Sequence, residues 1–105
     1  MLFFLFLLFP LLAQADEPSL LCEGKTRFVH RGAASTVPAD EKRSYRIEAN
    51  QLDGLDCKQE NGKIGCMGLT PQQAYRRVVI DMTAHTVSDT LELPTSLLIF
   101  EGTCK

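Results

Sequence analysis

The four cysteines are the residues whose spacing restricts their chemistry most. They stand at positions 22, 57, 66 and 104, and no interval between them is the Cys-x-x-Cys of redox motifs and zinc ribbons. In a short exported chain, four cysteines are typical of two structural disulfides, for which three pairings exist. We therefore expect all four to be disulfide-bonded, and the elements that carry them must decide the pairing.

Histidine and carboxylate chemistry is sparse. His30 and His85 are the only histidines, and neither has a His, Cys or Asp partner at the spacing of metal ligands. Asp81 stands four residues before His85, but a carboxylate beside one imidazole is no mechanism without a nucleophile. The sequence predicts no catalytic residue, no metal site and no cofactor.

The arginines would recognise an anion only if the fold brought several of them together. The formal net charge is −2, and acidic and basic residues are mixed along the chain, which gives no basis for binding nucleic acid or an anionic membrane. Most of the arginine side chains are therefore expected on a solvated face. The arginines considered are Arg27, Arg31, Arg43, Arg46, Arg76 and Arg77.

A hairpin over residues 56–66 pairs two of the cysteines. Asn61-Gly62 is the strongest short signal for a two-residue type I′ turn, because both central residues need a positive φ. Cys57 then faces Cys66 on a non-hydrogen-bonded rung, a spacing that suits a disulfide. Cys22 is left to pair with Cys104. The chain-entropy model assigns roughly 2.5 kcal/mol to the short loop and roughly 4.5 kcal/mol to the long one.

The two ends of the domain mirror each other. Residues 20–30 and 96–104 have β character and are expected to be the first and last strands. Antiparallel pairing that puts Cys22 opposite Cys104 also puts Gly24 opposite Gly102. Paired glycines leave a notch in which a neighbouring side chain or backbone approaches closely.

Residues 1–15 carry no charged side chain and end in Ala-x-Ala, which is typical of a secretory signal peptide. This apolar run is shorter than the roughly 20 residues that span a bilayer, so it is not expected to be a membrane anchor. Once the signal peptide is cleaved, no membrane span is expected. Residues 16–105 then form one domain, periplasmic or secreted, near the size at which a core alone is marginal.

The middle of the chain is interpreted as short strands and turns. Residues 44–49, 77–83 and 87–93 have strand patterns, and residues 31–43 have none and are interpreted as a long exposed loop. Thr70-Pro71 resembles a helix start of at most one or two turns. We predict an all-β fold: a small antiparallel barrel or sandwich of six to seven strands, with at most one short helical turn and two disulfides.

Three short motifs stand out: Cys22-x-Gly24, Phe100-x-Gly102-x-Cys104-Lys105, and Val79-Ile80-Asp81 between them. Together they resemble a pattern that recurs among small exported proteins of Gram-negative bacteria, which implies a compact β domain in the periplasm. In size, export and disulfides the chain is also similar to periplasmic inhibitors of lysozyme, small β-barrels that block an enzyme's cleft with a loop. No residue of that family is carried over.

These observations favour a non-catalytic exported binding domain, with an inhibitor as its sharper form. Loops on a rigid sheet usually carry recognition, so the unknown protein partner is expected to contact the loop of residues 31–43 and the hairpin tip. The alternatives are an accessory subunit of a cell-envelope assembly and, as the weakest, a small hydrolase. The predicted contact residues are Arg31, Asp40, Glu41, Lys42, Arg43, Asn61 and Gly62.

Overall fold

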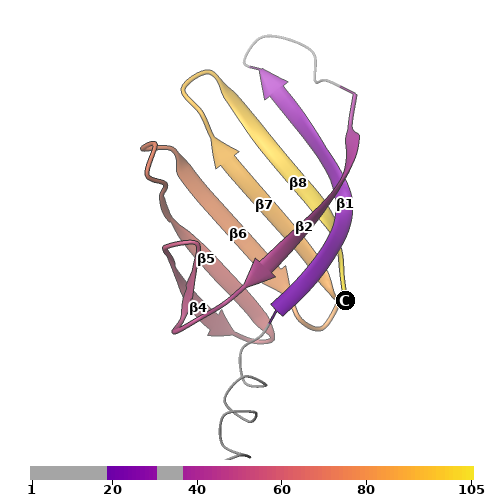
Figure 1. Cartoon of the computed structure of the whole chain (residues 1–105), viewed down its shortest axis with the longest axis vertical. Coiled ribbons are helices and arrows are strands. Elements are labelled where there is room, and N and C mark those ends of the chain that lie inside the picture. Colours follow the sequence, from indigo (N-terminus) through magenta and orange to yellow (C-terminus); the bar gives the residue numbers. More distant parts are fainter. Residues whose placement is uncertain (1–18, 31–36) are drawn as a thin grey trace, which may run out of the picture.

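The computed structural model describes residues 19–30 and 37–105, which form one antiparallel sheet of eight strands. Figure 1 shows the sheet curled into a half-barrel, with β2 crossing in front of its inner face. The order across the sheet is β2-β1-β8-β7-β6-β5-β4-β3. The strands are β1 (Ser19–His30), β2 (Ala39–Arg46), β3 (Gln51–Leu52), β4 (Leu55–Glu60), β5 (Lys63–Leu69), β6 (Tyr75–Asp81), β7 (Thr86–Glu92) and β8 (Ser96–Cys104).

The all-β prediction is confirmed, but the number of strands is eight rather than six to seven, and the residues that resemble a helix start form a loop. No helix occurs within residues 19–30 and 37–105. Residues 70–74 form the loop of the β5–β6 hairpin, in which Thr70 Oγ1 accepts a hydrogen bond from the Ala74 backbone N–H at 3.1 Å. The Thr70 carbonyl accepts another from Gln73, whose φ is 68°. Thr70, which was expected to cap a helix, therefore closes the tight turn between β5 and β6.

The second half of the predicted exposed loop is also wrong, because residues 39–43 belong to β2 and pair with β1. Their charges alternate between the two faces of the strand. On the outer face, Asp40 lies opposite Lys25 and Lys42 lies opposite Glu23, with nitrogen–oxygen distances of 2.7 and 3.6 Å. Opposite charges on facing rungs stabilise an antiparallel pair, so this charged run is compatible with a strand.

Three two-residue turns with positive φ connect the strands from β2 to β5. Consecutive positive φ angles are the signature of the type I′ turn, whose twist matches that of the flanking strands. The turn at residues 61–62 confirms the predicted hairpin, and the turn at 53–54 creates β3, a strand not expected from the sequence. The φ angles are 51° and 63° for Ala49 and Asn50, 49° and 85° for Asp53 and Gly54, and 50° and 78° for Asn61 and Gly62.

Both predicted disulfides form on the predicted rungs. Cys57 faces Cys66 across β4 and β5, and Cys22 faces Cys104 across β1 and β8. The Cα atoms are 4.0 Å apart in each pair, which matches the closer, non-hydrogen-bonded rung of an antiparallel ladder. The two bonds therefore link neighbouring strands near both ends of the half-barrel.

The predicted glycine rung is confirmed, and the space beside it is filled by backbone. Gly24 faces Gly102. A Cβ on Gly24 would lie 2.0 Å from the carbonyl oxygen of Glu101, and one on Gly102 would lie 2.4 Å from that of Glu23. The two glycines thus allow β1 and β8 to approach each other directly.

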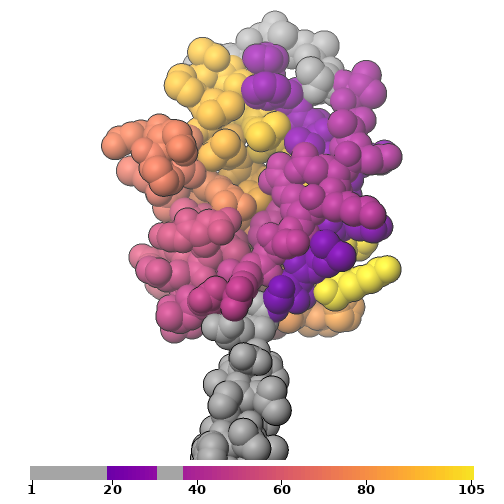
Figure 2. Space-filling model, viewed as in Figure 1, coloured from indigo at the N-terminus to yellow at the C-terminus, as the bar shows by residue number. Residues whose placement is uncertain are grey.

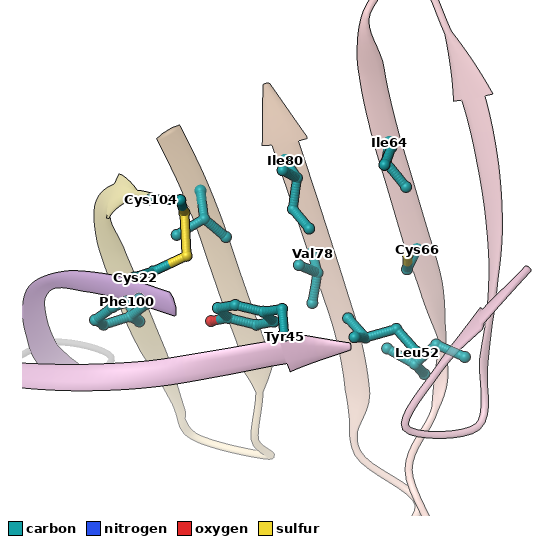
Figure 3. Close-up of a cluster of buried hydrophobic side chains, with 11 residues drawn as sticks. Cys22, Tyr45, Leu52, Ile64, Cys66, Val78, Ile80, Phe100 and Cys104 are labelled. Carbon is teal, nitrogen blue, oxygen red and sulfur yellow. A yellow bond between two sulfur atoms is a disulfide. The ribbon is translucent and has the colours of Figure 1, made fainter. Parts of the chain in front are cut away.

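The core lies on the inner face of the sheet and extends under β2. Tyr45 of β2 is 2% exposed, and in Figure 3 its ring points toward the sheet that carries Phe100 and Val78. Figure 2 shows the magenta residues of β2 lying in front of the yellow and orange strands. Ile80 of β6 is buried in this core, whereas Met82 follows the end of β6 and is exposed. The edge strand β2 therefore covers the core of the sheet to which it belongs.

Candidate functional site

A carboxylate lies in this core. Asp89 of β7 is 2% exposed and occupies an inward position between Val87 and Leu91. Arg76 of β6 donates to both of its oxygens, from Nε to Oδ1 at 3.0 Å and from Nη2 to Oδ2 at 2.8 Å. The Tyr45 hydroxyl donates to Oδ2 at 2.8 Å. The inner face thus holds a dense polar cluster that spans β2, β6 and β7.

Arg43 and two further carboxylates complete the cluster. Arg43 Nη1 donates to Asp89 Oδ2 at 3.1 Å, and its Nε donates to Glu41. The guanidinium carbon of Arg43 also lies 4.7 Å from the centroid of the Phe100 ring, within the range of a cation–π contact. Arg76 Nη1 bonds Asp53 Oδ2 at 3.1 Å.

The electrostatics of this cluster favour a structural role. Burial raises the pKa of Asp89, but the hydrogen bonds from Arg76 and Tyr45 and the charges of Arg76 and Arg43 outweigh it and hold that pKa below its ordinary value. Burial and the neighbouring Asp89 raise the pKa of the Tyr45 hydroxyl. Asp89 stays ionised and surrounded by hydrogen-bond donors near neutral pH. It is therefore a poor proton acceptor, and it holds together the strands that carry these donors.

The predicted contact residues of β2 do not form one surface. Glu41 and Arg43 face the core side, whereas Asp40 and Lys42 lie on the outer face in ion pairs. Arg31 lies outside the described residues. The charged residues of β2 are therefore divided between the core face and the outer face of the sheet.

The arginines are divided in the same way. Arg43 and Arg76 converge on Asp89. The other arginines that the structure describes lie on the outer face, and they are Arg27, Arg46 and Arg77. There, Arg27 Nη2 lies 3.9 Å from Glu101 Oε1, and Arg46 Nε lies 3.0 Å from Glu48 Oε1. The structure brings two arginines together around a carboxylate of the chain itself.

The two histidines lie apart from the cluster. The His30 ring stacks on Phe28 with centroids 4.7 Å apart, and His85 is in the β6–β7 turn with a φ of 59°. Asp81 Oδ1 accepts hydrogen bonds from the backbone N–H groups of Ala84 and Thr83, which lower its pKa. In the described ranges, no three His, Cys, Asp or Glu side chains are grouped as metal ligands.

A second candidate site lies on the outer face of β4, β5 and β6. This outer groove has a volume of about 600 Å³ and passes over Gly65. Lys58 and Val79 stand directly opposite Gly65 on the two neighbouring strands, and Lys63 and Met67 flank it along β5. A Cβ on Gly65 would have no neighbouring atom within 4 Å. Because Gly65 has no side chain, an open pit remains on the outer face between Lys58 and Val79.

Apolar side chains extend outward from this groove. Met67 is 45% exposed, Leu69 66% and Tyr75 37%. Leu69 faces Tyr75 on the β5–β6 ladder, and Met67 faces Arg77. Of the predicted hairpin tip, Asn61 lines the groove. The groove and this apolar extension together form a candidate contact surface on these three strands.

Comparisons of the chain with protein-family models, with curated proteins and with solved structures found no match. Nor does the described part of the chain contain a helix that is long and apolar enough to cross a membrane. The two disulfides indicate an oxidising, extracellular-type environment. The function is therefore inferred from the geometry.

Sequence reasoning missed Asp89 and the pit at Gly65, and each left a signal. On β7, Asp89 occupies a position at which the alternation of the strand predicts an inward, apolar side chain. On β6, Arg76 occupies such a position too, two residues before Val78 and four before Ile80. Charges of opposite sign at inward positions of neighbouring strands indicate a buried pair, since a lone buried charge is costly. On β5, Met67 and Leu69 make the outward face apolar as well as the inward one.

Proposed function

We propose that this chain is a non-catalytic binding domain, periplasmic or secreted, that contacts a protein partner through the outer groove. The pit above Gly65 carries the proposal, because it is a concave feature bordered by exposed Met67 and continued by other exposed apolar side chains. Surfaces of this kind are typical of protein–protein contacts.

The state of the buried carboxylate supports a role without catalysis. A general base needs a free lone pair and a pKa near the working pH. Asp89 accepts bonds from Arg76, Tyr45 and Arg43, and its pKa is lowered. The buried carboxylate of the core is thus committed to holding the strands together.

Filling the pit tests this proposal without disturbing the fold. In Gly65→Val the new side chain enters open space on an extended strand, where β-branched residues are favoured. Thr103→Val on the exposed outer face of β8 is the matched control. We expect the wild type and Thr103→Val to capture the same partner from an envelope fraction at fixed stoichiometry, and Gly65→Val to lose it. Equal capture by all three would refute the proposal.

An inhibitor of a hydrolase is the sharper form of this function. The Asn61–Gly62 turn ends the β4–β5 ladder, and the Cys57–Cys66 disulfide restrains the hairpin behind it. A rigid tip loses little conformational entropy when it enters an enzyme cleft. This form predicts a stoichiometric complex with a muramidase or a protease and loss of that enzyme's activity. Full activity in an excess of the chain excludes it.

An accessory subunit of a cell-envelope assembly is a second candidate. The exposure of Leu69 and Tyr75 favours it, because permanent interfaces are more apolar than transient ones. In this case the chain co-purifies with the assembly at constant stoichiometry, and Leu69→Ser releases it whereas Gly65→Val does not. Release of the chain from the assembly by Gly65→Val and not by Leu69→Ser would instead favour binding through the outer groove.

A further inference from the structure

We propose that a second copy of this chain occupies the outer groove, in a symmetric dimer that packs the outer faces of the two β5 strands against each other. Met67 of each copy enters the pit above Gly65 of the other. Lys58 of each copy pairs with Asp56 of the other. The dimer goes beyond the proposed function, because it forms in the absence of a partner and covers the groove. The second copy and the partner therefore exclude each other.

A protrusion and a hollow are neighbours on the outer face of β5. Met67 is 45% exposed, and Gly65 lies two residues away on the same face of the strand. A Cβ on Gly65 would have no neighbouring atom within 4 Å. Outward positions of one strand are about 6.8 Å apart, so a two-fold axis across the strands, midway between these residues, brings each Met67 over the other Gly65. A two-fold interface requires such a face, because residue i contacts j and j contacts i.

The charges of β4 fit the same axis. Lys58 stands across from Gly65, and Asp56 stands across from Met67. The axis that exchanges these two levels therefore places each Lys58 over the Asp56 of the other copy. Within the described part of the chain, Lys58 has no carboxylate oxygen within 4.0 Å. Asp56 Oδ1 accepts a hydrogen bond from Gln51 Nε2 at 3.1 Å, and this neutral donor leaves the charge of the carboxylate in place.

Strand β6 adds contacts on the other side of β5 without opposing like charges. Val79 and Arg77 stand at the levels of the pit and of the protruding methionine, so each Arg77 lies over the Val79 of the other copy. There its aliphatic stem packs while the guanidinium stays in water. Farther from the axis, the same exchange of levels places Tyr75 opposite Asp81 of the other copy. The balanced charge of the groove thus suits a second copy, which presents the same charges in reversed order.

The curvature of the sheet confines the contact to β4, β5 and β6. Figure 1 shows the sheet curled around its inner face, so the outer face is convex. Packed sheets keep their strand directions within about 30°, which displaces residues one strand away from β5 by roughly 2–3 Å. Lysine and arginine side chains are long enough to cover this displacement. Interfaces below roughly 1,200 Å² are typical of weak association, so we expect a dissociation constant in the micromolar to millimolar range.

Sedimentation equilibrium of the purified chain, with both disulfides formed, tests the dimer. We expect the wild type to change from monomer to dimer as its concentration rises toward millimolar. Gly65→Val fills the pit and should weaken dimerisation at least about tenfold, since two methionine side chains lose most of their burial. Thr103→Val, on the outer face of β8, is the matched control and should dimerise as the wild type does. Equal dimerisation of both variants, or a monomeric wild type at millimolar concentration, would overturn the inference.

Charge reversal tests the register of the two copies. Lys58→Glu and Asp56→Lys each oppose like charges at two symmetric contacts. Either variant alone should dimerise about tenfold more weakly, since each exposed pair changes affinity by up to about fivefold. An equimolar mixture of the two variants should recover wild-type association as a heterodimer, because both contacts again join opposite charges. Lys105→Glu, beyond the end of β8, is the control and should dimerise normally. A mixture no more associated than the separate variants would overturn the inference.

Three outcomes separate the dimer from the proposed function. If the chain stays monomeric but Gly65→Val loses the captured partner, the partner-binding function stands and the dimer is wrong. If the chain dimerises as described but Gly65→Val retains the partner, the dimer stands and the function fails. A monomeric chain that binds phosphatidylglycerol vesicles, and that Leu69→Ser releases from them, would assign the surface to lipid and overturn the dimer.

Discussion

The guanidinium of Arg76 binds both oxygens of the Asp89 carboxylate, at 3.0 and 2.8 Å. A bidentate pair of this kind fixes orientation as well as distance. It joins the neighbouring strands β6 and β7, and Tyr45 and Arg43 of β2 add their bonds to the same carboxylate. The edge strand is thereby fastened over the middle of the sheet that it covers.

Removing the charge of Asp89 should release β2. We expect Asp89→Asn to lower the free energy of unfolding by about 3 kcal/mol, because it leaves Arg43 and Arg76 partly buried without their common counter-ion. Tyr45→Phe, which removes a single buried bond at 2.8 Å, should cost about 1–2 kcal/mol. Urea denaturation measures both. Asp40→Asn, at an exposed ion pair, should leave the midpoint nearly unchanged, and an equal loss there would contradict the assignment.

The same carboxylate predicts the acid limit of stability. The pKa of Asp89 is lower in the folded chain than its ordinary value of 3.8, so the unfolded chain binds the proton more readily. Its stabilisation is therefore complete well above pH 3.8 and is lost as the pH falls through the folded pKa. The wild type should lose stability relative to Asp89→Asn only below about pH 4. A difference between them that stays constant down to pH 2 would contradict this.

The two disulfides should contribute unequally. Replacing Cys22 and Cys104 by alanine removes a link across 82 positions and should cost about 4.5 kcal/mol. Replacing Cys57 and Cys66 removes one across nine positions and should cost about 2.5 kcal/mol. Guanidinium titration of the two double variants measures the difference. A larger loss for the hairpin pair would show that chain entropy is not the main contribution.

The glycine rung and the pit provide a matched pair of alanine substitutions. Gly24→Ala places a methyl group 2.0 Å from the Glu101 carbonyl oxygen and should cost about 3 kcal/mol, because β1 and β8 must move apart. Gly65→Ala enters open space and should be neutral or stabilising by up to about 1 kcal/mol. Thermal unfolding of both variants checks the expectation, and similar melting temperatures would show that the close approach is not essential.

Much of the strand pattern could be predicted because it depends on neighbours along the chain. The two-residue turn at Asn61 and Gly62 sets the register of its own hairpin, so Cys57 meets Cys66. The cysteine count then leaves Cys22 for Cys104, and the glycine rung follows from that pairing. Thr70 misled the prediction because its side chain satisfies a backbone N–H equally well in a helix cap and in a hairpin loop.

The sequence by itself determined the Asn61–Gly62 turn, the alternation of most strands and the two covalent pairs, since these follow from local backbone preferences and from the few ways of pairing four thiols. Only the tertiary structure decided that residues 39–43 form a strand, because their partners lie on β1. It also decided that Tyr45 meets Asp89 across 44 positions. Such contacts depend on how the whole sheet curls, and no local preference encodes that curvature.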